Sequence, residues 1–139
     1  MRVQELISRR PVTVPPELTV TKAAETMVKN GVGSLIVAVG SNIYGIVTER
    51  DIVRAAASGL PFESSIKDIC TRKLVTVSAT DDVGKAATLM AANRIRHLVV
   101  TDQNGSLLGV LSIRDLLAEK RTLDAVASSY GSEPFPGGD

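Results

Sequence analysis

The chain has 139 residues, of which 44% are hydrophobic and 3% aromatic, and its 16 basic and 15 acidic side chains leave a formal net charge of +1. This size suits one ordinary domain or two half-size units that share a core. The balanced charge and the scarcity of aromatic rings argue against a nucleic-acid partner. No apolar run approaches the roughly 20 residues that cross a bilayer, and the N-terminus lacks the pattern of a signal peptide, so we expect a cytoplasmic protein with no membrane partner.

Two residue types with reactive side chains occur only once each, as Cys70 and His97. One cysteine cannot form an internal disulfide, and one cysteine with one histidine cannot make a structural zinc site within one chain. We expect Cys70 to be a small packed residue. The sequence has no phosphate-binding P-loop and no nucleophile that can be paired with a base, so it predicts no catalytic residues, no metal and no enzyme activity.

The first half of the chain alternates strand and helix patterns. A β-branched run bounded by prolines predicts a short strand, and apolar residues at i, i+3, i+4 and i+7 predict a helix that Thr19 caps and Gly31 ends. Two continuous apolar runs of strand length follow this helix. The expected elements, in order, are a strand at 12–14, a helix from 20 to 30, strands at 35–39 and 43–47, and a helix that stops at Gly59.

The second half of the chain repeats the first half. Val12–Val14 matches Val75–Val77 at an offset of 63 residues, and Gly45 matches Gly109 at an offset of 64 residues. One residue has therefore been inserted in the turn between these positions, where insertions are tolerated best. Two copies are too few for a solenoid, so we expect each copy to cover the open apolar face of the other.

The repeat sets the expected domain organisation. Residues 66–70 have the pattern of a short helical lead-in to the second copy, in which Asp82 replaces Thr19 as the helix cap and Asn104–Gly105 favours a hairpin turn. The last helix is expected at Ile113–Ala127, and the residues after it have linker composition. The predicted divisions are a first repeat at 5–60, a linker at 61–65, a second repeat at 66–127 and a disordered tail at 128–139.

One seven-residue motif occurs in both copies, as Gly45–Asp51 and Gly109–Asp115. In each copy a hydroxyl residue stands three positions before an aspartate, which is the spacing of a helix capping box. The same geometry offers a second role, because free amides and the positive end of the helix dipole attract an oxyanion. The arginine before the aspartate, Arg50 or Arg114, adds a bidentate partner for phosphate. Capping alone and ligand binding are both open interpretations of the motif.

These paired repeats, each ending in glycine, two apolar residues, Ser or Thr, two variable residues and Asp, resemble a tandem cystathionine β-synthase (CBS) domain pair, also called a Bateman module. The resemblance covers about Glu5 to Ala127. It implies an α/β (α+β) fold of two pseudo-twofold-related β-α-β-β-α repeats packed through their sheets. It also implies two clefts between the repeats that bind adenosine-containing ligands, a regulatory role, and assembly of two modules into a disc.

The resemblance assigns roles to the matching positions. Asp51 and Asp115 would accept hydrogen bonds from ribose hydroxyls, and a carboxylate is able to accept from two vicinal hydroxyls at once. Thr48 and Ser112 would bond phosphate beside free amides. The candidate ligand-binding residues are Thr13, Thr48, Arg50, Asp51, Thr76, Arg96, His97, Ser112, Arg114 and Asp115.

The second repeat carries a basic turn at Asn93–Leu98, where the first repeat has glycines and a serine. It resembles the turn that reaches phosphates in the nucleotide-sensing subunit of the AMP-activated kinase, with Arg96 and His97 at the matching positions. A solvated helix end is the alternative, because cations suit the C-terminal end of a helix dipole. In the resembled architecture such a turn faces the ligand held by the other repeat, which favours the cleft of the first motif for a charged nucleotide. At the strand leads, Thr13 and Thr76 lie where the family contacts base or sugar.

Two classes of function compete. The first is a ligand-sensing module: an adenine nucleotide (AMP, ADP or ATP, with S-adenosylmethionine and NAD as the other candidates) binds in a cleft and alters how a homodimer acts on a regulated protein that the sequence does not identify. The second is a ligand-independent dimerisation or protein-interaction module whose motifs are only helix caps. The first class predicts that a nucleotide stabilises the protein, and the second predicts no such effect. Neither class requires a prosthetic cofactor.

Overall fold

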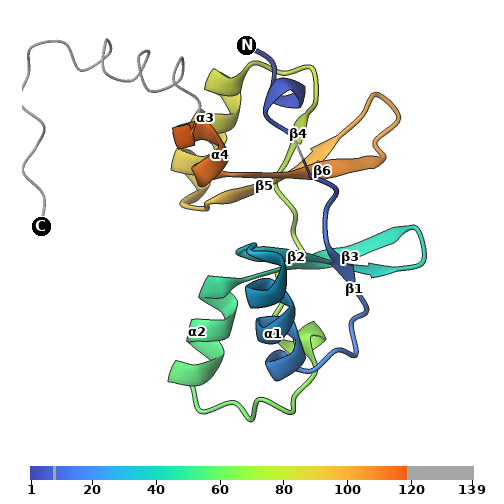
Figure 1. The fold of residues 1–139 in the computed structure, drawn as a ribbon, viewed down its shortest axis with the longest axis vertical. Helices are drawn as coiled ribbons and strands as arrows, with labels where there is room; N and C mark the ends of the chain where they lie inside the picture. The colour runs from blue at the N-terminus through green and yellow to red at the C-terminus, as the bar shows by residue number, and fades with distance from the viewer. Residues whose placement is uncertain (8, 119–139) are drawn as a thin grey trace, which may run out of the picture. The chain divides into compact units, whose positions relative to one another are not determined.

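The computed structural model describes residues 1–7 and 9–118, which form two compact units (Figure 1). The first-repeat unit is Arg10–Leu74, and the second-repeat unit joins Met1–Arg9 to the chain from Val75 onward. The end of the predicted last helix and the predicted tail at 128–139 lie outside the described residues. Within the described ranges, no helix combines the length and the apolar character needed to cross a membrane.

The first-repeat unit is a three-stranded sheet with helices on one face. Its strands lie in the order β1-β2-β3, with β1 parallel and β3 antiparallel to β2. Figure 1 shows α1 and α2 on the same side of this sheet. The elements are β1 (Thr13–Val14), α1 (Val20–Asn30), β2 (Ser34–Val39), β3 (Asn42–Thr48), α2 (Glu49–Ala57) and the 3-10 helix η2 (Ile66–Asp68).

The core of this unit lies between the sheet and its helices. Alternate residues of a strand point to opposite faces, so Leu35 and Val37 face the helices while Ile36 faces the other way. The predicted apolar stripe of α1 covers Leu35 and Val37 and includes Met27, which is buried. The fully described core consists of Val14, Val20, Ala23, Met27, Leu35, Val37, Val47 and Ile66.

The second-repeat unit has the same plan, with strand order β4-β5-β6 and the same parallel and antiparallel pairings. Its core again lies between the sheet and its helices, where the strand residues Val77 and Leu98 share one apolar cluster with the helix residue Met90. The elements are the 3-10 helix η1 (Val3–Leu6), β4 (Thr76–Ser78), α3 (Val83–Asn93), β5 (His97–Thr101), β6 (Leu107–Ser112) and α4 (Ile113–Ala118).

The structure confirms the predicted α+β class and the predicted order strand, helix, strand, strand, helix in both repeats. The predicted helix caps are also present, because the Thr19 hydroxyl accepts from the Lys22 N–H and the Asp82 carboxylate accepts from the Gly84 N–H. Gly31 ends α1 with a left-handed backbone (φ 62°), as its position after the helix predicts.

The two 3-10 helices are exchanged between the repeats. In sequence η1 precedes the first repeat, but the Val3 N–H donates to the Asp81 carbonyl, 2.9 Å away, and Val3 is fully buried in the second-repeat core. In sequence η2 leads into the second repeat, but the Ile66 N–H donates to the Leu18 carbonyl at 2.8 Å, and Ile66 is fully buried in the first-repeat core. Each repeat therefore completes its core with the segment that precedes the other one.

Because of this exchange, the repeats seen in the sequence and the compact units of the structure have different boundaries. The predicted boundaries of 5–60 and 66–127 follow sequence repetition, whereas the compact units divide near residues 9 and 74 because packing decides them. Residues 66–70 are the predicted lead-in to the second copy in sequence, and their apolar side chains pack in the first-repeat unit. Ile66, Ile69 and Cys70 are all part of that core or lie against it.

Candidate functional site

The first copy of the motif forms a corner where β3 meets α2. Thr48 is the N-cap of α2, its N–H donates to Asp51 Oδ2 at 2.9 Å, and its hydroxyl lies 3.3 Å from the same oxygen. The reciprocal capping box that the spacing predicts is present. The carboxylate is thus held in a fixed position beside the start of the helix.

The second copy forms the same corner where β6 meets α4. The Ser112 N–H donates to Asp115 Oδ2 at 2.8 Å, and the Asp115 N–H donates to Ser112 Oγ at 3.2 Å. The capping interpretation therefore holds for both copies. Capping engages Oδ2 of each aspartate, so the two corners present the same pair of groups, a hydroxyl and a carboxylate, in the same arrangement.

The turn before the middle strand lies beside the motif of its own repeat. The Ile113 N–H donates to the Arg96 carbonyl at 2.8 Å, and His97 is the direct strand partner of Ser112. In the first repeat the Glu49 N–H donates to the Gly33 carbonyl at 3.1 Å in the same way. The structure therefore brings the predicted residues Arg96 and His97 next to the second motif.

The hydroxyl residues of each repeat share the sheet face that points away from the helices. Thr48 pairs with Ser34 on the neighbouring strand, and Thr13 pairs with Ile36. Ser34 and Ile36 are two residues apart on β2 and so point to the same face, which the three hydroxyl residues therefore share. Because β2 separates β1 from β3, Thr13 lies two strand spacings from Thr48, about 10 Å. A ligand that contacts both Thr13 and Thr48 would have to extend over the face of the sheet from β1 to β3.

The second-repeat sheet repeats this arrangement. Ser112 pairs with His97, and Thr76 pairs with Val99 two residues further along β5. Ser34, a buried polar residue, stands where the second repeat has His97. Sequence reasoning did not single out Ser34, although its alignment with His97 was available as a signal.

Asp51 is a buried carboxyl group with only 8% of its surface exposed. Burial raises its pKa above the ordinary value, while the hydrogen bonds from Thr48 and the charges of Arg54 and Arg50 act in the opposite direction. Ionisation of this carboxyl group costs free energy because the charge is partly removed from water, and a ligand that donates hydrogen bonds to the carboxylate would offset part of that desolvation cost.

The glycine of each motif allows a neighbouring segment to approach closely. A Cβ on Gly45 would lie 2.5 Å from the Thr71 carbonyl oxygen, and a Cβ on Gly109 would lie 2.9 Å from a methyl group of Ile7. Thr71 also forms a β-bridge with Ile46. Sequence reasoning treated these glycines only as the start of the motif, but a glycine repeated in both copies was a signal of close backbone approach.

The segment after η2 passes close to Asp51. Burial raises the pKa of the half-buried Cys70 thiol, the nearby Arg72 lowers it, and the Asp51 charge raises it further. Arg72 stacks 3.5 Å above the centre of the Tyr44 ring, and its Nε donates to the Tyr44 carbonyl at 2.7 Å. Cys70 is a packed residue, as predicted, and no described residues form a cluster able to hold a metal ion.

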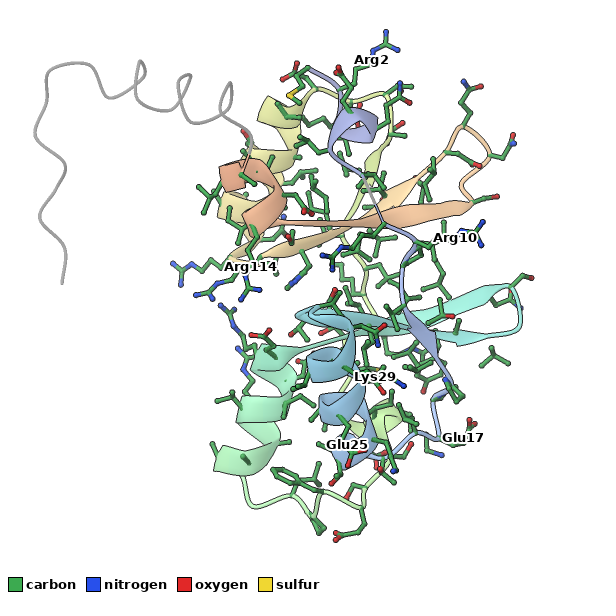
Figure 2. The ribbon with its side chains drawn as sticks, viewed as in Figure 1. Arg2, Arg10, Glu17, Glu25, Lys29 and Arg114 are labelled. Carbon is green, nitrogen blue, oxygen red and sulfur yellow. The ribbon has the colours of Figure 1, made fainter. Side chains whose placement is uncertain are left out.

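The two corners differ in charge. The corner of the second repeat carries three arginines and a histidine, whereas the matching positions of the first repeat carry one arginine, two glycines and a serine. In Figure 2 Arg114 extends from the beginning of α4. The matching residues are Arg94 and Gly31, Arg96 and Gly33, His97 and Ser34, and Arg114 and Arg50.

Comparison with known proteins identifies relatives across nearly the whole chain. A family model described as the CBS domain matches residues 3–58 and 66–121. The chain is 38% identical to the CBS domain protein PAE2072 from Pyrobaculum aerophilum, solved in complex with AMP, with a TM-score of 0.84 over 92% of this chain and 99% of that one.

Two curated relatives extend the comparison. An uncharacterized 17.7 kDa protein from Acidianus ambivalens is 34% identical over 94% of this chain and 78% of its own length. An inosine-5'-monophosphate dehydrogenase from Korarchaeum cryptofilum is also 34% identical, but the match spans 83% of this chain and only 23% of the enzyme. The similarity to the dehydrogenase therefore concerns a part of that enzyme.

Proposed function

This chain belongs to the CBS domain family, with two copies of the domain, and on that premise we propose that it is a regulatory module that binds AMP, ADP or ATP and transmits occupancy to a partner protein. The similarity to a CBS domain protein solved with AMP carries the proposal. The two corners support it, because each presents a fixed carboxylate and a hydroxyl beside the first turn of a helix.

The chemistry of the corners suits an adenosine ligand. In this proposal, Oδ1 of Asp51 and of Asp115 accepts hydrogen bonds from the two ribose hydroxyls, since capping engages Oδ2. Thr48 and Ser112 then face the phosphate, together with the nearby guanidinium groups. Thr13 and Thr76 contact the base or sugar on the same sheet face. A ligand of this kind shifts the protein between two states only through its different affinities for them.

The proposed role is regulatory and not catalytic. The match to the dehydrogenase covers a minor part of that enzyme, so its activity is not carried over to this chain. In this proposal the carboxylate, the hydroxyl and the guanidinium groups of each corner hold the nucleotide through hydrogen bonds and charge. Signalling then requires a separate protein that recognises one state of the module.

A thermal-shift experiment tests the proposal. AMP, ADP, ATP, S-adenosylmethionine and NAD are added to the wild type and to the Asp51→Ala and Asp115→Ala variants. A ligand at 100 times its dissociation constant adds about 2.7 kcal/mol to the free energy of unfolding, and at least one variant is expected to lose this gain.

Asp82→Ala is the matched control, because Asp82 caps α3 outside the motif through a 2.8 Å bond from the Gly84 N–H. It should lower the midpoint through loss of a cap and leave the ligand-induced shift intact. If no adenosine ligand stabilises the wild type, the nucleotide-sensing function is wrong.

A second candidate function, a dimerisation module that needs no ligand, is favoured by an apolar groove in the first-repeat unit. The groove has a volume of about 450 Å³ between α1 and α2 and is lined mainly by apolar side chains. Val28 is 84% exposed and Phe62 41% exposed at this surface. Glu25 and Lys29 also line it, one turn apart on α1.

We propose that a second copy of the chain covers this groove. Glu25 lies 3.3 Å from Lys22 of its own helix, and in a two-fold symmetric contact its carboxylate can also meet the Lys29 of the other protomer, so the surface is self-complementary in charge as well as apolar. Lys29→Glu should weaken a homodimer in sedimentation equilibrium, and the double exchange Glu25→Lys with Lys29→Glu should restore it. A wild type that sediments as a monomer at all concentrations would exclude this partner.

A further inference from the structure

Arg94 has a backbone conformation that its residue type disfavours. It ends α3 with φ 54° and ψ 44°, and it is the one non-glycine residue with a positive φ in the part of the chain that the structure describes. A Cβ crowds the backbone in this left-handed region, so glycine is the usual residue there. A non-glycine residue in this region is a reason to look for a function of its side chain.

The first repeat provides an internal comparison. Gly31 occupies the equivalent position at the end of α1, with φ 62° and ψ 36°, and both residues close the helix with their N–H groups bonded to carbonyls of the last turn. The same turn is therefore built in this chain with glycine and without steric cost. The fold of the second repeat does not require an arginine here.

Arg94 stands at the start of the basic turn beside the second motif. It precedes Arg96, whose carbonyl accepts the Ile113 N–H at 2.8 Å, and two residues of chain span at most about 7 Å. His97 follows as the strand partner of Ser112. The Arg94 side chain thus begins at the same end of the sheet as the hydroxyl of the second motif.

The charges around this corner point to an anion with several negative charges. The segments that meet at this corner carry three arginines, Arg94, Arg96 and Arg114, and one aspartate, Asp115, and Ile113 takes the place of the acidic Glu49 of the first repeat. Guanidinium groups bind phosphate oxygens in bidentate geometry. Three guanidinium groups offer more N–H donors than the three terminal oxygens of one phosphate monoester accept in bidentate pairs, so a ligand with further phosphates can use more of them.

We propose that Arg94 is a ligand-recognition residue that contacts the distal phosphates of a bound nucleotide and makes affinity rise with phosphate number. The inference rests on the proposed nucleotide-binding function. The competing account is that Arg94 stabilises α3 by placing a cation at the negative end of the helix dipole. The two accounts differ in what they predict for glycine at this position.

The experiment measures the affinity of the full chain for adenosine, AMP, ADP and ATP by titration calorimetry, together with the thermal midpoint. It compares the wild type with Arg94→Gly, Arg94→Lys and the control Arg2→Ala. Figure 2 shows Arg2 at the opposite end of the second-repeat unit from Arg114, so the control removes one positive charge of that unit away from the basic turn.

In Arg94→Gly we expect an affinity for ATP at least about tenfold lower, the factor that corresponds to 1.4 kcal/mol, with adenosine affinity and midpoint maintained. Arg94→Lys should fall between this variant and the wild type, and Arg2→Ala should match the wild type. An unchanged ratio of ATP to adenosine affinity in Arg94→Gly would overturn the proposal while leaving nucleotide binding intact. A wild type that binds none of the four ligands would overturn the proposed function as well.

Discussion

At the scale of a single residue, the proposed role of Asp51 predicts that ligand binding depends on pH. Burial raises the pKa of this carboxyl in the folded chain, so it takes up a proton at a higher pH than an ordinary aspartate as the solution is acidified. Protonation weakens the carboxyl group as an acceptor, which is the role proposed for it toward the two ribose hydroxyls. Affinity for an adenosine ligand at this corner is therefore expected to fall as the pH drops through the raised pKa.

Protonation of Asp51 has the opposite effect on the stability of the fold, which rises as the pH falls. In the window between the raised pKa of folded Asp51 and its ordinary value of 3.8, the folded state binds more protons than the unfolded state. The contribution of Asp51 to the free energy of unfolding therefore increases as the pH falls through this window. Asp81 and Asp82 have lowered pKa values because each accepts a hydrogen bond from a backbone N–H, and they act in the other direction, so the measurement needs a difference between two proteins.

The test compares urea unfolding of the wild type and Asp51→Asn between neutral and acidic pH. The amide cannot titrate, so the variant loses the Asp51 contribution and keeps those of the other acidic residues. We expect the difference in stability to shift in favour of the wild type as the pH falls. A difference that stays constant over the whole range would show that burial does not perturb Asp51.

Several residue roles could be predicted and others could not. Thr19, Gly31 and Asp82 were recognised as caps because capping depends on local sequence. The positive φ of Arg94 could not be read from the sequence, because it follows from the turn geometry and not from the residue type. The stacking of Arg72 on Tyr44 depends on a tertiary approach that no local pattern encodes.

At the scale of elements, the exchanged 3-10 helices make the stability of each repeat depend on a segment outside it. Ile66 is fully buried in the first-repeat core. Ile66→Ala should reduce the free energy of unfolding by about 2–5 kcal/mol, as for other large apolar residues in cores. Lys67→Ala is the control, because its exposed side chain lies in the same short helix.

Hydrogen exchange locates this effect. In Ile66→Ala the amides of β2 and β3 are expected to lose more protection than those of β5 and β6, because Ile66 packs with the first repeat. Faster exchange confined to β5 and β6 would show that η2 belongs with the repeat that it precedes in sequence.

The helices were predictable because they carry a periodic apolar stripe, and the strands because they are continuous apolar runs of strand length, as at Leu35–Val39. The exchange of η1 and η2 was not. A 3-10 helix of three or four residues has too few positions for a periodic signal, and the choice of which core it fills is tertiary. Internal repetition therefore identified the repeats but not the compact units.

At the scale of the whole chain, two repeats of one plan differ in the charge around their motifs. The second repeat carries Arg94, Arg96 and Arg114 in the segments around its motif. At the matching positions the first repeat has only Arg50, and Arg54 also acts on its Asp51. A duplicated scaffold with unequal corners suits a sensor that distinguishes ligands of different charge. The regulated protein is the remaining component of that account, and differential affinity for two states links it to the ligand.

Binding of an adenine nucleotide at the motif corners is the proposal on which the regulatory role depends. Titration of the ¹⁵N-labelled chain with AMP, followed by two-dimensional NMR, tests it at the level of individual amides. The largest shifts are expected at residues 48–51, at residues 112–115, or at both, and Asp51→Ala or Asp115→Ala should remove the shifts of its own corner. Shifts confined to the groove between α1 and α2, or no shifts at a saturating concentration of AMP, would contradict the proposal.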